Sequence, residues 1–183
     1  METLHSTTVI STVGPLFLAA STRGLMALEF DVRLPGQQTI RPNPRDLREE
    51  RIHRRAKKVE FQESRDAMRT YVQQLDEYFA GERREFSFAL DLRGTDFQLA
   101  CWRALLAIPY GQTRTYGDIA RAVGRPHGFR AVGMANNRNP VAIVVPCHRV
   151  IASDGTLCGY GGGLDIKRKL LELEGALSCT LAA

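Results

Sequence analysis

Hydrophobic and polar residues follow a pattern typical of β-strands over the first thirty positions. Residues 7–12 are rich in β-branched side chains, residues 16–20 are apolar, and Gly24 precedes another apolar run at 25–30. Gly14-Pro15 is a turn signal between the first two runs. The pattern predicts a hairpin or a small meander at the start of the chain.

A helical period replaces this pattern after Glu63. Apolar residues recur there at three- and four-residue spacings, which place them on one face of a helix that Gly81 closes. The residues of this stripe are Met68, Tyr71, Val72, Leu75, Tyr78 and Phe79. Beyond it, Phe86, Phe88 and Leu90 alternate with smaller residues, as in a half-buried strand. The sequence therefore predicts one packing helix followed by a further strand.

Short helices are predicted for the second half of the chain. Thr95 or Asp96 can cap a first helix, and two more are expected at 116–123 and 129–136. A tight turn separates the last two. This spacing fits a helix-turn-helix, and it fits plain helix packing as well.

The remaining segments complete the predicted architecture. An apolar run at 142–145 predicts a short buried strand or extended segment, the glycines at 155–163 predict a loop, and Asp165 opens a last helix. The fold class is therefore α+β, with a small N-terminal sheet domain at residues 1–92 and a mostly helical C-terminal domain at residues 93–183. Because no long linker separates them, the two are expected to pack together.

Composition and charge restrict the class of protein. The chain has 183 residues, of which 44% are hydrophobic and 25% charged, as in an ordinary globular protein. A net charge of +5 favours a polyanionic partner. The basic stretch at 41–58 is more typical of a solvated loop than of a DNA-contacting arm. No apolar run approaches the roughly 18 residues of a membrane helix and no secretory signal opens the chain, so we expect no membrane association and a cytoplasmic location.

The cysteines raise the question of a reactive thiol. They are Cys101, Cys147, Cys158 and Cys179. They form no C-x-x-C pair and show no metal-ligand spacing, so we expect reduced thiols and no metal site. Cys147 is followed by His148 and Arg149, a base and a positive charge that favour the nucleophilic thiolate. Because a Cys-His dipeptide alone is more often structural, both interpretations stay open here.

Longer motifs identify a family. The segment Pro146-Cys147-His148-Arg149-Val150 resembles the signature of the O6-alkylguanine-DNA alkyltransferases, also called methylated-DNA-protein-cysteine methyltransferases. Matching motifs in the same order are Gly94-Thr95-x-Phe97-Gln98, Trp102, Ile108-Pro109-x-Gly111-x-Thr113-x-Thr115-Tyr116, Arg130-Ala131-Val132-Gly133, Asn139-Pro140, Gly159-Tyr160-x-Gly162-Gly163 and Leu170-Leu171-x-x-Glu174-Gly175. The looser N-terminal resemblance includes Tyr78-Phe79-x-Gly81. The resemblance implies a ribonuclease H-like N-terminal domain and a winged-helix-like C-terminal domain.

The resemblance also implies a reaction. Cys147 is expected to take the alkyl group from O6 of guanine in DNA, and less efficiently from O4 of thymine. The protein is consumed because the thioether has no easy leaving group. His148 would take the thiol proton through a water, Glu174 would orient the imidazolium, and Asn139 would hold the active-site turn. Without the resemblance, Glu174 would be interpreted as a solvated carboxylate. No cofactor is implied.

A substrate pocket follows from the same resemblance. Tyr116 is expected to hydrogen-bond the guanine and to donate a proton to its ring. The residues expected to line or adjoin the alkyl pocket are Tyr160, Gly161, Val150 and Lys167. Because the thiolate must lie in line behind the alkyl carbon, the base has to leave the duplex.

DNA contacts are expected from the third short helix. Arg130 resembles the arginine that fills the gap left in the base stack, and Ala131, Gly133 and Ala135 are small enough for a close approach to the minor groove. The implied partner is double-stranded DNA that carries O6-alkylguanine. We expect a monomer in solution and leave cooperative assembly on DNA open.

Two other functions compete with repair. A lesion-recognition module of the same fold binds alkylated DNA without repairing it, but such proteins lack the cysteine that this chain has at Cys147. A thiol hydrolase that uses Cys147 and His148 would leave Arg130 and the helix-turn-helix unexplained. The chain departs from many relatives at Cys158 and Lys169, where we expect altered packing or altered loop chemistry rather than lost activity.

Overall fold

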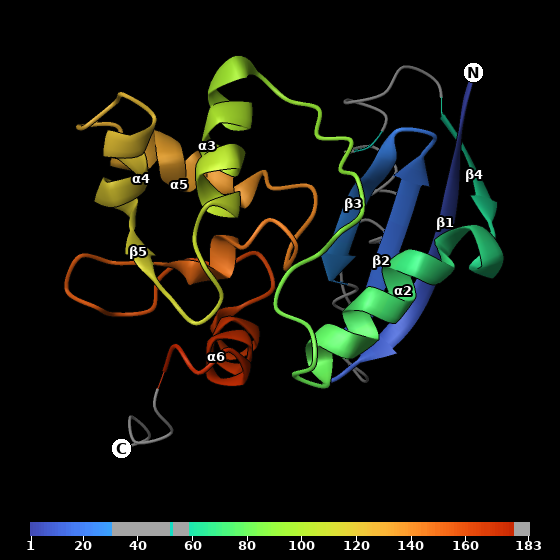
Figure 1. Cartoon of the computed structure of the whole chain (residues 1–183). Helices are drawn as coiled ribbons and strands as arrows, with labels where there is room; N and C mark the ends of the chain where they lie inside the picture. The colour runs from blue at the N-terminus through green and yellow to red at the C-terminus, as the bar shows by residue number, and fades with distance from the viewer. Residues whose placement is uncertain (31–51, 53–58, 178–183) are drawn as a thin grey trace, which may run out of the picture.

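The computed structural model describes residues 1–30, 52 and 59–177. Within them the predicted α+β architecture is confirmed, because a mixed sheet from the N-terminal part lies beside a group of helices from the C-terminal part (Figure 1). No described helix is long and apolar enough to cross a membrane. The basic stretch at 41–58, apart from Ile52, and Cys179 lie outside the described residues.

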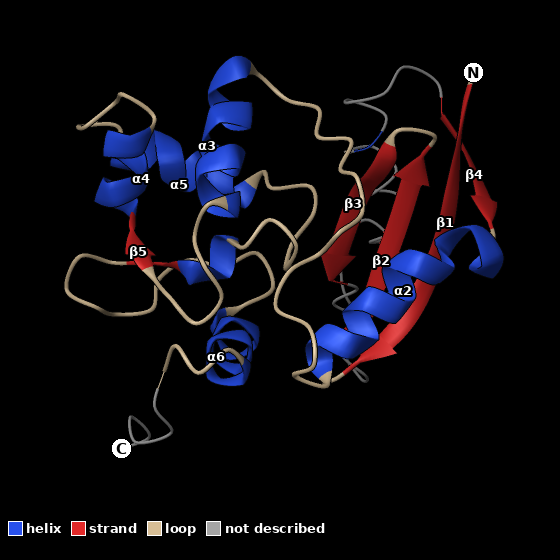
Figure 2. Ribbon diagram, viewed as in Figure 1, coloured by secondary structure: helices blue, strands red, loops and turns tan. Residues whose placement is uncertain are grey.

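The N-terminal sheet has four strands with one helix on one face (Figure 2). Its elements are β1 (Glu2–Ser11), β2 (Gly14–Ser21), β3 (Gly24–Phe30), β4 (Val59–Glu63) and the covering helix α2 (Arg65–Phe79). The spatial order is β3-β2-β1-β4, with β1, β2 and β3 antiparallel and β4 parallel to β1. The meander is as predicted, although Gly14 and Pro15 begin β2 rather than form the turn. Strand β4 was not predicted because only its first residue, Val59, is buried.

Helix α2 confirms the predicted apolar stripe. The Ser64 side chain caps its N-terminus by accepting a hydrogen bond from the Ala67 N–H, and Gly81 follows its C-terminus with a φ of 76°. Met68, Leu75 and Tyr78 are fully buried. The stripe therefore holds α2 against the sheet and directs Tyr78 toward the C-terminal half of the molecule.

The C-terminal part is mostly helical, as predicted. Its elements are α3 (Asp96–Leu106), α4 (Tyr116–Ala122), α5 (Phe129–Asn137), the 3₁₀ helix η1 (Cys147–Arg149), α6 (Leu164–Leu173), and the parallel pair β5 (Arg114–Thr115) and β6 (Val150–Ile151). Capping boxes start two of these helices, with Thr95 and Gln98 at α3 and with Thr115 and Asp118 at α4. The predicted starts of α3 and α4 are therefore confirmed, whereas α6 begins at Leu164, one residue before the predicted Asp165.

The edge of β3 joins the two parts, and here one prediction is wrong. Residues 86–90 do not form a strand, since only Leu90 makes an isolated bridge, to Leu25. The same edge is shared with the loop before η1, where Leu28 bridges to Val141. Two short segments thus divide an edge that one longer strand could otherwise have paired.

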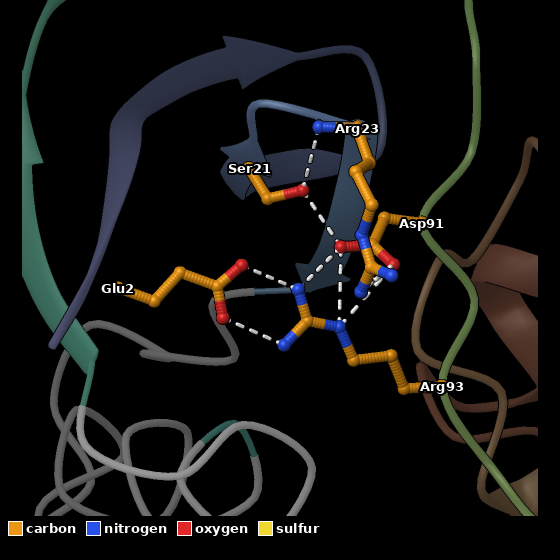
Figure 3. A network of polar contacts seen from close by, with 5 residues as sticks. All are labelled: Glu2, Ser21, Arg23, Asp91 and Arg93. Atoms are coloured by element: carbon orange, nitrogen blue, oxygen red, sulfur yellow. Dashed lines mark hydrogen bonds and ion pairs between the residues drawn. The ribbon is translucent and has the colours of Figure 1, made fainter.

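A buried carboxylate fixes the connection between the two parts. Asp91, whose residue is 6% exposed, accepts a hydrogen bond from Ser21 Oγ at 2.7 Å and pairs with Arg23 at 2.9 Å (Figure 3). Arg93 contacts Asp91 at 2.5 Å and reaches Glu2 at 2.5 Å (Figure 3). These contacts satisfy the buried charge and hold the chain beside β3 as it leaves the sheet and enters α3.

Candidate active site

The segment before Cys147 is a buried turn rather than the predicted strand. Residues 142–145 fold back on themselves, and the Val145 N–H donates to the Val141 carbonyl at 2.9 Å. Ile143 has a φ of 71°, which is a strained left-handed conformation for a β-branched residue. The burial expected from the apolar run is present. The tight turn was not predicted because isoleucine rarely adopts this conformation.

The N-terminal sheet positions this turn. The Leu28 N–H in β3 donates to the Pro140 carbonyl at 2.9 Å, and the Ala142 N–H donates to the Leu28 carbonyl at 3.0 Å. Because β3 belongs to the packed sheet, the turn that presents Cys147 is anchored to the N-terminal part of the protein.

Asn139 links the turn to the thiol. Its side-chain Nδ2 donates to the Val145 carbonyl at 2.7 Å and to the Cys147 Sγ at 3.1 Å, and its Oδ1 accepts from the Val141 N–H at 3.0 Å. One side chain therefore fixes both the backbone of the turn and the sulfur atom. These contacts fit the role that the sequence predicts for Asn139.

The thiol of Cys147 is buried and protonated at rest. The residue is 8% exposed, and burial raises the pKa of its thiol, although the Asn139 hydrogen bond and the positive charge of Lys167 act in the opposite direction. The expectation that Arg149 favours the thiolate is wrong, because its guanidinium is paired with Glu174 instead. A base is therefore needed to remove the proton.

His148 is oriented to act as that base. It is fully buried, and its Nε2 lies 2.8 Å from Glu174 Oε1. Burial lowers the pKa of His148, so the imidazole is neutral. Because the ionised carboxylate only accepts, Nε2 carries the hydrogen and Nδ1 keeps its lone pair. Nδ1 has no partner among the described residues. It is thus the atom available to accept a proton.

Glu174 is the centre of a buried polar cluster at the C-cap of α6. Arg149 donates from Nε to Oε2 at 2.8 Å and from Nη2 to Oε1 at 2.9 Å, while Tyr78 OH donates to Oε1 at 2.7 Å. Burial alone would raise the pKa of Glu174, but the hydrogen bonds from His148 and Arg149 outweigh it and lower the pKa to about 2. The interpretation of Glu174 as a solvated carboxylate is thereby excluded.

Sequence reasoning missed the contributions of Arg149 and Tyr78 to this cluster. Tyr78 fits the apolar stripe of α2, and nothing in its spacing indicates a polar partner 96 residues away. The only available signal was its place in Tyr78-Phe79-x-Gly81, one of the motifs that carry the resemblance. Arg149 was noticed for its charge, but its direction could not be read from the sequence.

A cavity of about 710 Å³ opens beside Tyr116 at the start of α4. Its walls include Phe129 and Gly133 of α5, and Cys158 and Gly159 of the glycine-rich loop. Burial and the neighbouring Cys158 thiol raise the pKa of Tyr116, so its hydroxyl stays protonated and can donate a hydrogen bond.

The other predicted pocket residues lie around the glycine-rich loop. Lys167 is fully buried, and its Nζ donates to the Val150 carbonyl at 2.6 Å and to the Cys158 carbonyl at 2.9 Å. Val150 is buried and contributes this backbone contact, while Gly161 is exposed. The ring of Tyr160 packs edge-on against Phe30 of β3 with centroids 5.7 Å apart. Lys167 thus fastens the loop to β6.

The Tyr160 hydroxyl is a further polar group of the glycine-rich loop, although Tyr160 is not among the residues that line the cavity beside Tyr116. It is buried and has no partner among the described residues. A buried donor of this kind needs a partner, and a polar molecule in the pocket can supply one.

Helix α5 presents some of the predicted DNA-contacting residues. Arg130 and Ala131 are exposed at its start, and Gly133 is half-buried, with space for a Cβ 3.8 Å from the Tyr116 ring. Ala135 does not fit its predicted role. It is 2% exposed and its carbonyl accepts a hydrogen bond from Trp102 Nε1 at 3.0 Å, because this side of α5 packs against α3.

Metal-binding side chains do not gather within the part of the chain that the structure describes. No three histidine, cysteine, aspartate or glutamate side chains lie close enough together there to hold an ion. The Cys147 thiol accepts a hydrogen bond from the Asn139 amide and lies within the field of the Lys167 charge, and a base follows it in the sequence, which is a setting that suits a nucleophile.

Comparisons with known proteins agree with this geometry. A family model described as the 6-O-methylguanine DNA methyltransferase ribonuclease-like domain matches residues 4–92, and one described as the DNA binding domain of the same family matches residues 96–176. The methylated-DNA--protein-cysteine methyltransferase of Mycobacterium bovis is 48% identical over 171 residues, which cover 93% of this chain and 92% of that protein. Its counterpart from Methanosarcina barkeri is 46% identical over 90% of this chain and 92% of that protein.

Solved structures extend the comparison. The O6-methylguanine methyltransferase of Mycobacterium tuberculosis superposes with a TM-score of 0.76 at 46% identity, over 97% of this chain and 96% of that one. A structure of the Mycobacterium tuberculosis OGT in complex with DNA gives a TM-score of 0.75 at 46% identity, over 94% of this chain and 93% of that one.

Proposed function

Because the chain belongs to the 6-O-methylguanine DNA methyltransferase family, we propose that it repairs DNA by transferring the alkyl group of O6-alkylguanine to its own Cys147. The reaction is that of a methylated-DNA--protein-cysteine methyltransferase. Each molecule acts once, since the thioether formed on the sulfur has no easy leaving group.

One observation carries the assignment of the acceptor. Cys147 Sγ lies 3.1 Å from Asn139 Nδ2, and the next residue, His148, is bound to Glu174 at 2.8 Å. This sequence of nucleophile, base and orienting carboxylate is the arrangement that activates a weak nucleophile. The presence of the cysteine also favours repair over the alternative of a lesion-recognition module that does not react.

His148 removes the proton from Cys147. Its free Nδ1 takes the proton through a water, because the side chains of consecutive residues point in different directions. Glu174 stabilises the imidazolium that forms. The thiolate then attacks the alkyl carbon in line with the bond to O6. The carbon–sulfur bond forms as the carbon–oxygen bond breaks.

Tyr116 assists departure of the guanine. Its hydroxyl gives a proton to the ring nitrogen as the carbon–oxygen bond breaks, so the base leaves as neutral guanine. The tyrosinate then regains a proton from solvent, and the imidazolium of His148 releases the thiol proton to solvent. In sum, the proton lost by the thiol is balanced by the proton gained by the base. Tyr160, Gly161, Val150 and Lys167 shape the pocket, with Lys167 holding the loop closed through its two carbonyl contacts.

Double-stranded DNA is bound along α5. Its exposed start carries Arg130 and Ala131, and Gly133 lies beside Tyr116, so a base that leaves the stack enters the cavity next to the helix. Arg130 fills the space that the base vacates. Ala135 is excluded from this surface because it is buried.

The two parts of the chain have different roles. We assign residues 1–92 to a structural domain and residues 93–183 to a DNA-binding and alkyl-transfer domain, and we place the protein in the cytoplasm. The sheet domain supports the chemistry through β3, which anchors the turn that carries Cys147.

Intact-mass spectrometry tests the proposed function. The protein is mixed with an excess of duplex that carries one O6-methylguanine, and the modified peptide is mapped. We expect one methyl group per molecule, on Cys147, and none on the Cys147→Ala variant.

The matched control is Cys101→Ala, which removes a fully buried thiol of α3. It is expected to take up one methyl group like the parent. An unmodified parent that still shifts the lesion duplex in a gel would instead support a recognition module, and methylation at Cys158 would move the acceptor to the pocket wall.

A further inference from the structure

We propose that Tyr78 of the N-terminal domain is a positioning residue for alkyl transfer, which acts by holding Glu174, the carboxylate that orients His148. This inference rests on the proposed function and adds a residue from outside the alkyl-transfer domain to its machinery.

The contact between the two residues is direct and buried. Tyr78 OH donates to Glu174 Oε1 at 2.7 Å, and the tyrosine is fully buried. The same oxygen accepts from His148 Nε2 at 2.8 Å and from Arg149 Nη2 at 2.9 Å. The hydroxyl therefore shares the oxygen atom that orients the base.

The Tyr78 hydroxyl reaches Glu174 from a different element than the other two donors do. His148 and Arg149 both belong to η1, whereas Tyr78 comes from α2 on the sheet domain. Glu174 is the C-cap residue of α6, and its N–H donates to the Leu170 carbonyl at 3.0 Å, so the helix fixes its backbone and the donors to the carboxylate fix its side chain. With donors from two different elements, the carboxylate cannot turn about its side-chain bonds without breaking a buried hydrogen bond.

The ring of Tyr78 is fixed as firmly as its hydroxyl. It lies in a group of aromatic rings, with centroid distances of 5.4 Å to Phe79, 5.5 Å to Phe86 and 6.2 Å to Tyr110. A tyrosine held only for packing would be expected to leave its hydroxyl at the surface or on a backbone group. This one donates to an ionised side chain, which is the stronger kind of hydrogen bond.

Several other groups face the same centre and must be considered in any pH effect. The charged or titratable groups around Glu174 and His148 are Tyr78 of α2, Tyr110 after α3, Cys147 and Arg149 of η1, Tyr160 of the glycine-rich loop and Lys167 of α6. Tyr110 donates instead to the Leu173 carbonyl at 3.1 Å, and Lys167 to two backbone carbonyls. Among the described residues, the donors to the carboxylate are thus Tyr78, His148 and Arg149.

The expected consequences separate positioning from packing. Without the hydroxyl, the negative charge of Glu174 is shared with fewer donors, so it stabilises the imidazolium of His148 more strongly and raises the pKa of the base. The acidic limb of the pH–rate profile then moves to higher pH. Loss of the second anchor also lowers the plateau rate, by about tenfold for one hydrogen bond to a charged group.

The experiment measures the single-turnover rate of methyl transfer from O6-methylguanine duplex to Cys147 between about pH 5.5 and pH 9 in Tyr78→Phe. A second variant carries 3-fluorotyrosine at position 78, which keeps the ring and the contact but makes the hydroxyl a stronger donor. We expect a lower plateau and a midpoint at higher pH for Tyr78→Phe, and a midpoint at lower pH for the fluorinated protein. Affinity for the duplex, measured in a Cys147→Ser background, is expected to stay the same.

Tyr110→Phe is the matched control, because it removes the hydrogen bond that the neighbouring tyrosine donates to the Leu173 carbonyl at the end of α6. It is expected to lose stability without a change in the midpoint. If Tyr78→Phe fails to fold, the fluorinated protein still decides the question through its midpoint.

The inference is overturned if the midpoints of both position-78 variants coincide with that of the parent, even where the rate falls, since a purely structural role would give that result. Failure of the proposed function is recognised separately: the parent itself would then take up no methyl group on Cys147.

Discussion

Arg149 holds both carboxylate oxygens of Glu174, with Nε 2.8 Å from Oε2 and Nη2 2.9 Å from Oε1, inside the protein. Its third contact, from Nη1 to the Ile108 carbonyl at 2.6 Å, fixes the guanidinium to the end of α3. The residue that follows the base in sequence therefore orients the carboxylate that the base depends on. The pair of Arg149 and Glu174 therefore contributes both to the reaction and to the stability of the fold.

Removing Arg149 is expected to destabilise the protein strongly. Arg149→Ala leaves an uncompensated buried carboxylate, which costs about 3–5 kcal/mol of the free energy of unfolding. Urea unfolding at pH 7.5 measures this change. The control is Arg121→Ala, which breaks an exposed pair with Asp118 and is expected to cost no more than about 1 kcal/mol. Equal effects in the two variants would contradict the importance of the buried pair.

Acidification is expected to destabilise the protein in two steps. His148 has a folded pKa below its ordinary value of 6.5, so below that pH the unfolded chain binds a proton that the folded protein does not, and stability falls. Glu174 acts in the same direction at lower pH, between its ordinary value of 4.5 and about 2. Urea unfolding from pH 8 to pH 2.5 is expected to show a loss of stability that begins near pH 6.5 and becomes steeper below pH 4.5.

The histidine step can be assigned by substitution. His148→Gln is expected to make the free energy of unfolding less dependent on pH between pH 8 and pH 5. His127→Gln, which changes an exposed histidine, is expected to keep the pH dependence of the parent. A free energy of unfolding that is independent of pH in the parent over this range would contradict the neutral, buried state of His148.

Most of the fold could be read from the sequence because its signals are local. The apolar stripe that contains Tyr78 predicted α2, and the capping residue Thr95 predicted the start of α3. The strand predicted at 86–90 was wrong for a non-local reason. Alternation sets which side chains are buried, but a strand also needs a free partner, and the edge of β3 is shared with the turn before Cys147.

The sequence could predict which residues form the site, but not which way their side chains point. The motif around Cys147 named the nucleophile and the base, and the resemblance supplied Glu174. Which atom Arg149 contacts, and whether Ala135 faces DNA or α3, depend on packing between segments far apart in the chain. Tyr78 is the clearest case, since an aromatic residue on a core stripe gives no local indication of a buried carboxylate partner.

Arg130 is expected to matter for duplex DNA and not for a free base. It lies exposed at the start of α5, where it can replace an extruded base, and unstacking a base costs a few kcal/mol. Arg130→Ala is expected to slow repair of O6-methylguanine in duplex DNA by at least about tenfold, while its reaction with free O6-benzylguanine stays at the rate of the parent.

The control for this variant is Arg69→Ala, an exposed arginine on α2, which is expected to affect neither substrate. Equal losses of Arg130→Ala on the duplex and on the free base would show that the substitution disturbs the thiol rather than base extrusion.

Alkylation of Cys147 is expected to weaken the fold through Asn139. The sulfur lies 3.1 Å from Asn139 Nδ2, and the same side chain holds the Val145 carbonyl at 2.7 Å, so a methyl group on the sulfur pushes against the atom that fixes the turn. Overpacking of this kind costs about 1–3 kcal/mol, and in a protein of this size each kcal/mol corresponds to roughly 2–4 °C in Tm. Calorimetry is expected to show the methylated protein melting several degrees below the unreacted protein. In Asn139→Ala the difference should shrink, because the contact that methylation disturbs is already absent. Equal melting temperatures for the two forms of the parent would mean that the turn accommodates the methyl group without moving Asn139.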